Sequence, residues 1–120
     1  MMAFFYVFIG GGLGSMARLG IAKITPHTAP LFPWSTFIAN ILSCFILGVL
    51  IGLRVRGNLS QNAQFFLITG FCGGFSTFST FSLENLQLLQ EGRLTALAAY
   101  TGLSMLLGLA AVIAGVRLAG

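Results

Sequence analysis

Long stretches without ionised side chains alternate with short polar links along the chain. Windows 34–53, 62–83 and 94–116 contain no Asp, Glu, Lys or Arg, and the window 3–22 contains only Arg18. A membrane-spanning helix needs about 20 mainly apolar residues. The pattern therefore predicts an all-α integral membrane protein with four transmembrane helices, at roughly 3–22, 34–53, 62–90 and 94–117.

The composition agrees that lipid is the main solvent. Of the 120 residues, 57% are hydrophobic and 7% are charged, whereas about 25% are charged in a soluble domain. The links are too short for a soluble domain, so residues 1–120 are predicted to form a single membrane domain. The opening residues MMAFFYVFIGG lack the basic region and cleavage site of a signal peptide, which indicates a retained first span. The cations are scattered singly, which argues against nucleic-acid binding.

The positive charges are nearly balanced between the two ends of the predicted bundle. Four spans place both chain termini on the same side of the membrane. Arg54, Arg56 and Arg117 lie on that side, and Lys23, Arg93 and, if it extends that way, Arg18 lie on the other. So little bias allows the chain to insert in both orientations. We therefore expect an antiparallel, dual-topology homodimer with its two-fold axis in the membrane plane.

The third window contains features that disfavour a continuous helix. Gly73 and Gly74 are adjacent, and each glycine weakens a helix by about 1 kcal/mol relative to alanine. Five of the seven residues 76–82 carry hydroxyls, and Ser76 or Thr77 is suited to cap a restarted helix. The third helix is therefore predicted to be broken near the midplane, with the positive end of the restarted helix favouring an anion. The alternative is that the glycines only allow a close helix–helix contact.

Aromatic and polar side chains fall on single helical faces near this segment. Phe78 and Phe81 are three residues apart, and such rings either face lipid or turn their positive edges toward an anion. Two polar stripes accompany them, and each either lines a path or joins helices through hydrogen bonds. The stripes are Thr36, Asn40 and Ser43 on the second span, and Tyr100, Thr101, Ser104 and Gly108 on the fourth.

The few remaining reactive groups indicate no chemistry. Glu84 is the only acid inside a span, and we expect it to meet a helix terminus or an arginine of a neighbouring helix. Cys44 and Cys72 lie in apolar stretches, where two small buried hydrophobes are the simpler interpretation and a disulfide is the alternative. His27 stands alone in a proline-rich link without a nucleophile–base pair. The sequence therefore predicts that the protein is not an enzyme.

Three motifs together resemble the Fluc/CrcB family of fluoride channels. They are GGLGSMAR at 11–18, TFIAN at 36–40 and GFCGGFSTFSTFS at 70–82. The resemblance covers all four spans in length and order. It implies an antiparallel homodimer in the lipid of the bacterial plasma (inner) membrane. Such a dimer has two fluoride pores and a structural sodium ion at its centre. The resemblance further implies that the dimer exports fluoride passively down its electrochemical gradient and so protects the cell from fluoride toxicity.

The resemblance also implies a role for individual positions. It assigns Phe78 and Phe81 to a ring pair on the fluoride path, supported by Tyr100, and Asn40 to the pore asparagine. It assigns Thr36, Thr80 and Ser104 to a hydroxyl track and Arg18 to the pore vestibule. The backbone carbonyls of Gly73 and Ser76 from both subunits are assigned to sodium. Two positions depart from the family pattern. Ser76 replaces the usual threonine, and Gly108 replaces a serine that some members have.

Two other functions are compatible with four short spans. A small multidrug transporter exchanges protons through a carboxylate in its first helix, and the window 3–22 contains none. A non-transporting accessory protein would use its polar residues only to join helices. Fluoride flux through a reconstituted membrane separates both from a channel.

Overall fold

The computed structural model describes residues 2–25 and 32–120, and every element in these ranges is helical. The elements are α1 (Met2–Ile24), α2 (Trp34–Val55), α3 (Gln61–Ala63), the π-helix η1 (Gln64–Cys72), α4 (Gly73–Phe75), α5 (Phe78–Gln90) and α6 (Leu94–Ala119). His27, which the sequence analysis placed in a proline-rich link, lies outside the described residues.

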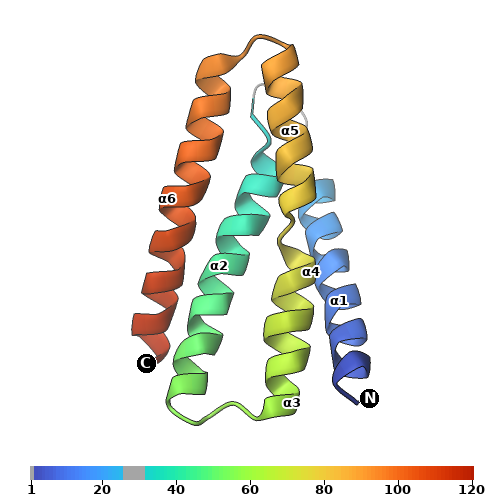
Figure 1. The fold of residues 1–120 in the computed structure, drawn as a ribbon, viewed down its shortest axis with the longest axis vertical. Helices are drawn as coiled ribbons and strands as arrows, with labels where there is room; N and C mark the ends of the chain where they lie inside the picture. The colour runs from blue at the N-terminus through green and yellow to red at the C-terminus, as the bar shows by residue number, and fades with distance from the viewer. Residues whose placement is uncertain (1, 26–31) are drawn as a thin grey trace.

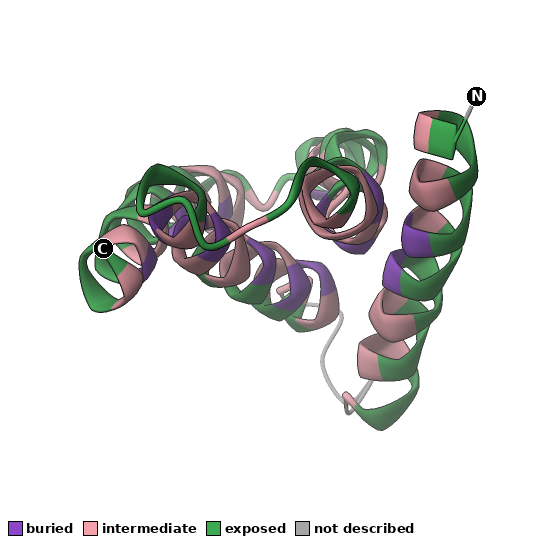
Figure 2. Ribbon diagram, turned by 90° about the horizontal axis from the view of Figure 1, so that it is seen from below, coloured by how far each residue is buried: buried purple, intermediate pink, exposed green. Residues whose placement is uncertain are grey.

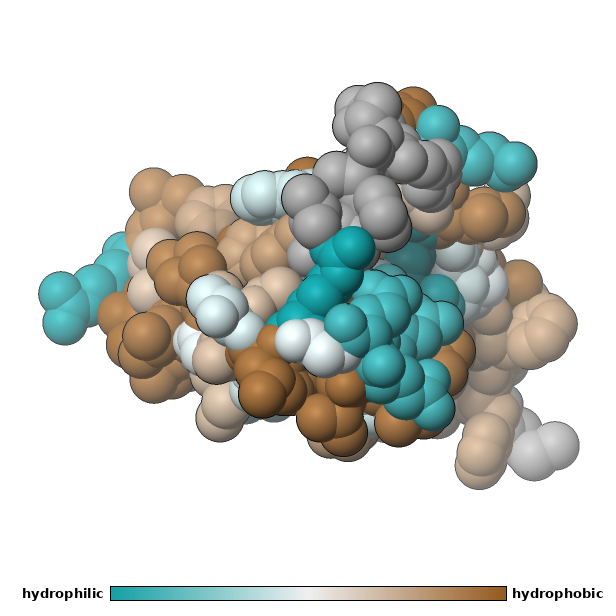
Figure 3. Space-filling model, turned by 90° about the horizontal axis from the view of Figure 1, so that it is seen from above, coloured by the Kyte–Doolittle hydropathy of each residue, from teal (hydrophilic) through white to brown (hydrophobic). Residues whose placement is uncertain are grey.

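Four segments are long and apolar enough to cross a membrane, as the sequence predicted. They are Met2–Ile24, Trp34–Val55, Gln61–Gln90 and Leu94–Ala119. The bundle is 47 Å long, which fits a bilayer of about 40–45 Å including its headgroups. Both termini lie at the same end of the bundle (Figure 1). The opposite end carries the α5–α6 turn, and its surface is polar near the centre and largely apolar around it (Figure 3).

The bundle consists of two close helix pairs, α1 with η1 and α4, and α2 with α6. Glycines four residues apart bring each pair together. A side chain at Gly10 or Gly14 would collide with the backbone of η1 and α4, and one at Gly48 or Gly52 would collide with the backbone of α6. Small residues at such spacing allow close contact between helices in lipid, where apolar surface alone does not drive association.

Most large apolar side chains point away from the bundle. Buried positions face the neighbouring helices, and exposed positions cover the outside (Figure 2). Phe4 and Phe8, for example, are exposed on α1. Such a surface is suited to lipid and not to water.

The third segment is interrupted between α4 and α5. Ser76 and Thr77 have extended backbone, with φ/ψ of −86°/157° and −150°/121°. The glycines that were expected to disfavour the helix do not end it, because Gly73 and Gly74 are both helical. Gly74 packs against the backbone of Gly11 on α1, so it serves the close contact that was the alternative interpretation. The helix restarts at Phe78, with Thr77 as its N-cap.

Candidate functional site

Asn40 on α2 holds the start of the interruption. Its Oδ1 accepts a hydrogen bond of 3.1 Å from the backbone N–H of Thr77. A backbone N–H can only donate, so the amide oxygen of Asn40 must face it. The orientation of the amide is thereby fixed, and its NH₂ group is left to donate elsewhere.

The same bond frees a carbonyl in the preceding turn. In an uninterrupted helix the N–H of Thr77 would donate to the carbonyl of Gly73. Because that N–H is taken by Asn40, Gly73 loses its helical donor. The last helical bond before the break runs from the N–H of Ser76 to the carbonyl of Cys72, at 3.1 Å.

One cavity of about 280 Å³ lies beside the break, between α2, α5 and α6. Its lining has no charged side chain and consists of Asn40, Cys44, Ser76, Thr77, Phe78, Phe81, Ser104 and Met105. The ring centroids of Phe78 and Phe81 are 6.0 Å apart, with the ring planes at 36°. The buried Oγ of Ser104 has no hydrogen-bond partner among the described residues. The structure thus brings together four of the side chains that the sequence predicted as pathway residues: Asn40, Phe78, Phe81 and Ser104.

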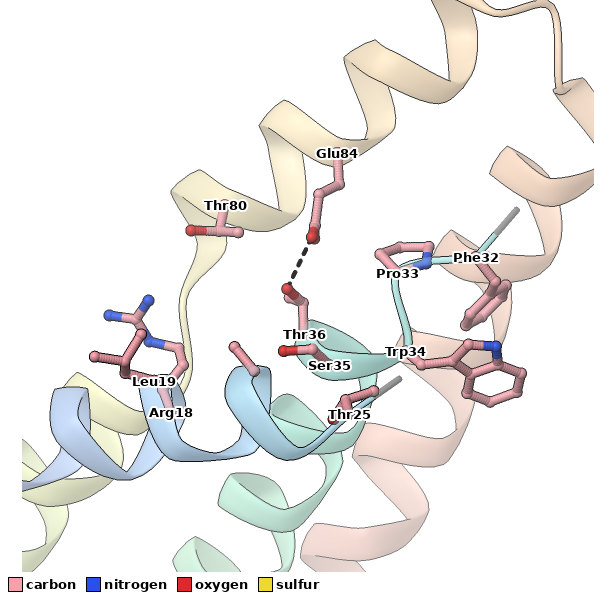
Figure 4. Close-up of a pocket in the computed structure, with 11 residues that line it drawn as sticks. Arg18, Leu19, Thr25, Phe32, Pro33, Trp34, Ser35, Thr36, Thr80 and Glu84 are labelled. Carbon is pink, nitrogen blue, oxygen red and sulfur yellow. Dashed lines mark hydrogen bonds between the residues drawn. The ribbon is translucent and has the colours of Figure 1, made fainter. Parts of the chain in front are cut away.

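A second cavity of about 330 Å³ opens between α1, α2 and α5 (Figure 4). Arg18, Thr36, Thr80 and Glu84 are among the polar residues that line it. The predicted pathway residues are therefore divided between two cavities, because Thr36 and Thr80 line the charged cavity and not the uncharged one.

Glu84 meets the first turn of α2, which is one of the two partners expected for it, through the hydroxyl of Thr36. It accepts hydrogen bonds from two hydroxyls and from no arginine among the described residues. The Oγ1 of Thr36 donates to its Oε2 at 3.0 Å, and the hydroxyl of Tyr100 donates to its Oε1 at 2.9 Å. The reason is geometric, since Glu84 lies one turn after Thr80 on α5 and faces α2 and α6. Figure 4 shows its bond to Thr36.

Tyr100 contacts one lining residue of each cavity, Glu84 and Phe81. Its side chain is fully buried, and its ring centroid lies 4.9 Å from that of Phe81. Because its hydroxyl is held by Glu84, the ring is fixed at both ends. This placement is compatible with a residue that supports Phe81.

From α1, Arg18 contacts the end of α4, just before the break. Its Nε donates to the carbonyl of Gly74 at 3.2 Å. In a continuous helix this carbonyl would accept from the N–H of Phe78, which is instead the first residue of α5. The side chain therefore both lines the charged cavity and satisfies a carbonyl that the interruption leaves free.

Comparison with known proteins identifies the family. The model of the CrcB-like protein family, described as Camphor Resistance (CrcB), matches residues 5–116. The chain belongs to this family. It is 46% identical over 113 residues to the fluoride-specific ion channel FluC of Azobacteroides pseudotrichonymphae, covering 92% of this chain and 90% of that protein.

Further relatives cover nearly the whole chain. The FluC protein of Flavobacterium psychrophilum is 43% identical over 121 residues, with 99% of this chain and 98% of the relative covered. That of Thermus thermophilus is 40% identical, with 100% and 97% covered. These relatives are named as ion channels and not as enzymes, which confirms the predicted family resemblance and the prediction that the protein is not an enzyme.

The side chains that line the two cavities without having been predicted as site residues include Glu84, Cys44 and Met105. Glu84 follows Thr80 by four residues, so the helical period alone could have placed both on one face. Cys44 follows Asn40 by four residues in the same way. Both cysteines are free, so the disulfide alternative is wrong, and Cys72 is buried while Cys44 lines the uncharged cavity. Met105 follows Ser104 directly and carries no sequence signal of its own.

Proposed function

We propose that this chain forms a fluoride-selective channel that exports F⁻ passively and protects the cell from fluoride toxicity. The relatives' names support fluoride as the transported ion. One structural observation carries the proposal for this chain. In the uncharged cavity, the free NH₂ of Asn40, the unpaired hydroxyl of Ser104 and the rings of Phe78 and Phe81 surround one space beside the start of α5.

Each of these groups can replace part of a hydration shell. An amide and a hydroxyl donate hydrogen bonds, and aromatic rings present positive edges. The N-terminus of α5 adds the positive end of its dipole and the N–H groups of its first turn. No lysine or arginine lines this cavity. A small, strongly hydrated anion would be held by several weak donors, which permits both entry and release.

The charged cavity is suited to serve as the mouth of the path. Arg18 attracts anions there, while the hydroxyl of Thr80 is available to one that has shed part of its water. Thr36 plays a different part, because its hydroxyl is bound to Glu84. An ion moving between the two cavities would pass Tyr100 and Phe81, which are packed against each other.

We further propose that two copies form an antiparallel homodimer in the bacterial plasma membrane. A single chain leaves the uncharged cavity open, since Phe78 is 79% exposed and Met105 is 70% exposed. Gly73 is also exposed, with nothing near the position of a Cβ atom. A second copy that covers this face would close the cavity and exclude lipid from the ion path.

The freed carbonyls fit a structural sodium ion at the dimer centre. The carbonyl of Gly73 has lost its helical donor and lies on the exposed face. The hydroxyl of Ser76 donates to the carbonyl of Cys72 at 3.0 Å, so this residue would contribute its carbonyl, and serine in place of threonine changes nothing at that atom. The Gly73 and Ser76 carbonyls of both subunits would hold the ion, which supplies a fixed positive charge that joins the subunits.

Fluoride efflux from proteoliposomes tests the function. The wild-type protein is expected to release fluoride at a rate set by membrane potential and to retain chloride. Phe78→Ile and Phe81→Ile should each abolish or sharply reduce the flux without changing the oligomeric state. Phe4→Ile is the matched control, because Phe4 is also 79% exposed but lies outside both cavities. The proposal is wrong if the wild type releases no fluoride, and the rings are not involved if both variants conduct normally.

A further inference from the structure

The carboxyl end of α4 needs a partner that the helix itself does not supply. The carbonyl of Gly74 has lost the N–H of Phe78 as a helical donor, because Phe78 begins α5. Carbonyls at the end of a helix also carry its negative partial charge. Gly74 is partly buried in a segment long and apolar enough to cross a membrane, where a carbonyl without a donor is unfavourable because water is scarce.

Arg18 supplies the missing donor through its nitrogen nearest the backbone. The Nε–H donates to the carbonyl of Gly74 at 3.2 Å across 56 positions of sequence. One turn earlier on α1, Gly14 lies directly against the backbone of Phe71 and Phe75. The missing side chain at Gly14 is what brings α1 close enough for Nε, and not only the tip of the guanidinium, to reach this carbonyl.

We propose that Arg18 is a positioning residue that fixes the end of α4 and thereby the direction in which Phe78 enters the uncharged cavity. The carbonyl of Gly74 belongs to the peptide bond with Phe75, and only Ser76 and Thr77 lie between Phe75 and Phe78. Both have extended backbone, so a rotation at the end of α4 is passed on to the ring. Asn40 fixes the other side of the same short segment through the N–H of Thr77. Arg18 and Asn40 thus hold the interruption from α1 and α2.

This role differs from that of a charge at the pore mouth. The two roles predict opposite orders of fluoride flux for two substitutions of Arg18. Counted along the side chain, the Nε2 of glutamine stands at the same position as the Nε of arginine. Arg18→Gln therefore keeps a donor for Gly74 and removes the charge. Arg18→Lys keeps the charge but places a methylene where Nε stood.

The inference rests on the proposed fluoride channel, and flux is its first readout. If Arg18 acts by position, Arg18→Gln should conduct better than Arg18→Lys, and the lysine variant should lose at least about tenfold in maximal flux. The fluoride concentration for half-maximal flux should change little in the lysine variant, which keeps the charge. A mouth charge alone would give the reverse order, together with a loss that shrinks at high ionic strength.

A second readout does not depend on conduction. The protein is labelled with 4-fluorophenylalanine at position 78, and its ¹⁹F NMR signal is recorded in detergent for the wild type and both variants. Arg18→Gln should keep the wild-type chemical shift, whereas Arg18→Lys should shift or broaden the signal. Wild-type protein without flux would refute the channel but leave this comparison intact. Identical spectra for both variants, or a signal altered only in the glutamine variant, would overturn the positioning role.

Discussion

Asn40 performs two functions with the two ends of one amide, and Asn40→Asp separates them. Its oxygen accepts from the N–H of Thr77 at 3.1 Å, and its side chain lines the uncharged cavity, where the NH₂ group is left to donate. Aspartate has the same shape and retains the acceptor, so the interruption keeps its partner. The donor is replaced by a carboxylate oxygen, which carries a tethered negative charge into the place proposed for the ion.

The expected loss follows from two contributions. A hydrogen bond to a charged partner contributes about 1.5–3 kcal/mol. Two like unit charges about 4 Å apart repel by about 4 kcal/mol at an effective dielectric constant of about 20. Their sum of roughly 6 kcal/mol corresponds to a decrease in fluoride occupancy of about four orders of magnitude. Flux through Asn40→Asp should therefore be undetectable.

The assay pairs fluoride efflux with thermal unfolding in detergent. Asn40→Asp should unfold near the wild-type temperature, because the N-terminus of α5 stabilises a negative charge beside it. Asn40→Ala is the control, and it should lose both flux and about 1–3 kcal/mol of stability, since the N–H of Thr77 is left without a partner. Wild-type flux through Asn40→Asp would refute a donor role for the amide. Equal destabilisation of both variants would refute the role of its oxygen.

Three further predictions concern the bundle. Gly48→Ala should lower the free energy of unfolding by about 1–3 kcal/mol, because its methyl group meets the backbone of Val112. Gly102→Ala, on the open face of α6, is the control and should not lower it. Equal effects of the two substitutions would contradict the glycine-mediated contact. Tyr100→Phe should reduce thermal stability by removing one donor to the carboxylate of Glu84, and an unchanged midpoint would show that this bond contributes nothing. Reporter fusions at the C-terminus should reveal both orientations in the membrane, whereas a single orientation would count against an antiparallel dimer.

The sequence predicts the spans well because hydropathy is a local property. The first span, expected at 3–22, is observed at Met2–Ile24, and the second, expected at 34–53, ends at Val55. The interruption was harder to place because helix propensity identifies residues that weaken a helix and not those that end it. Gly74 remains helical against α1. What holds the N–H of Thr77 out of the helix is Asn40, 37 positions away. The π-helix Gln64–Cys72 likewise has no local signal in its composition.

The sequence does not reveal which hydroxyls remain free, for a related reason. A row of hydroxyls in the sequence suggests a continuous track of donors, but the fold uses several of them for itself. Thr77 caps α5, Ser76 bonds to Cys72, and Thr36 bonds to Glu84. Among the polar side chains that line the uncharged cavity, the free groups are the hydroxyl of Ser104 and the NH₂ of Asn40. An anion can use only donors that the fold has left unpaired, so the path is defined by the hydrogen bonds that the protein does not make internally.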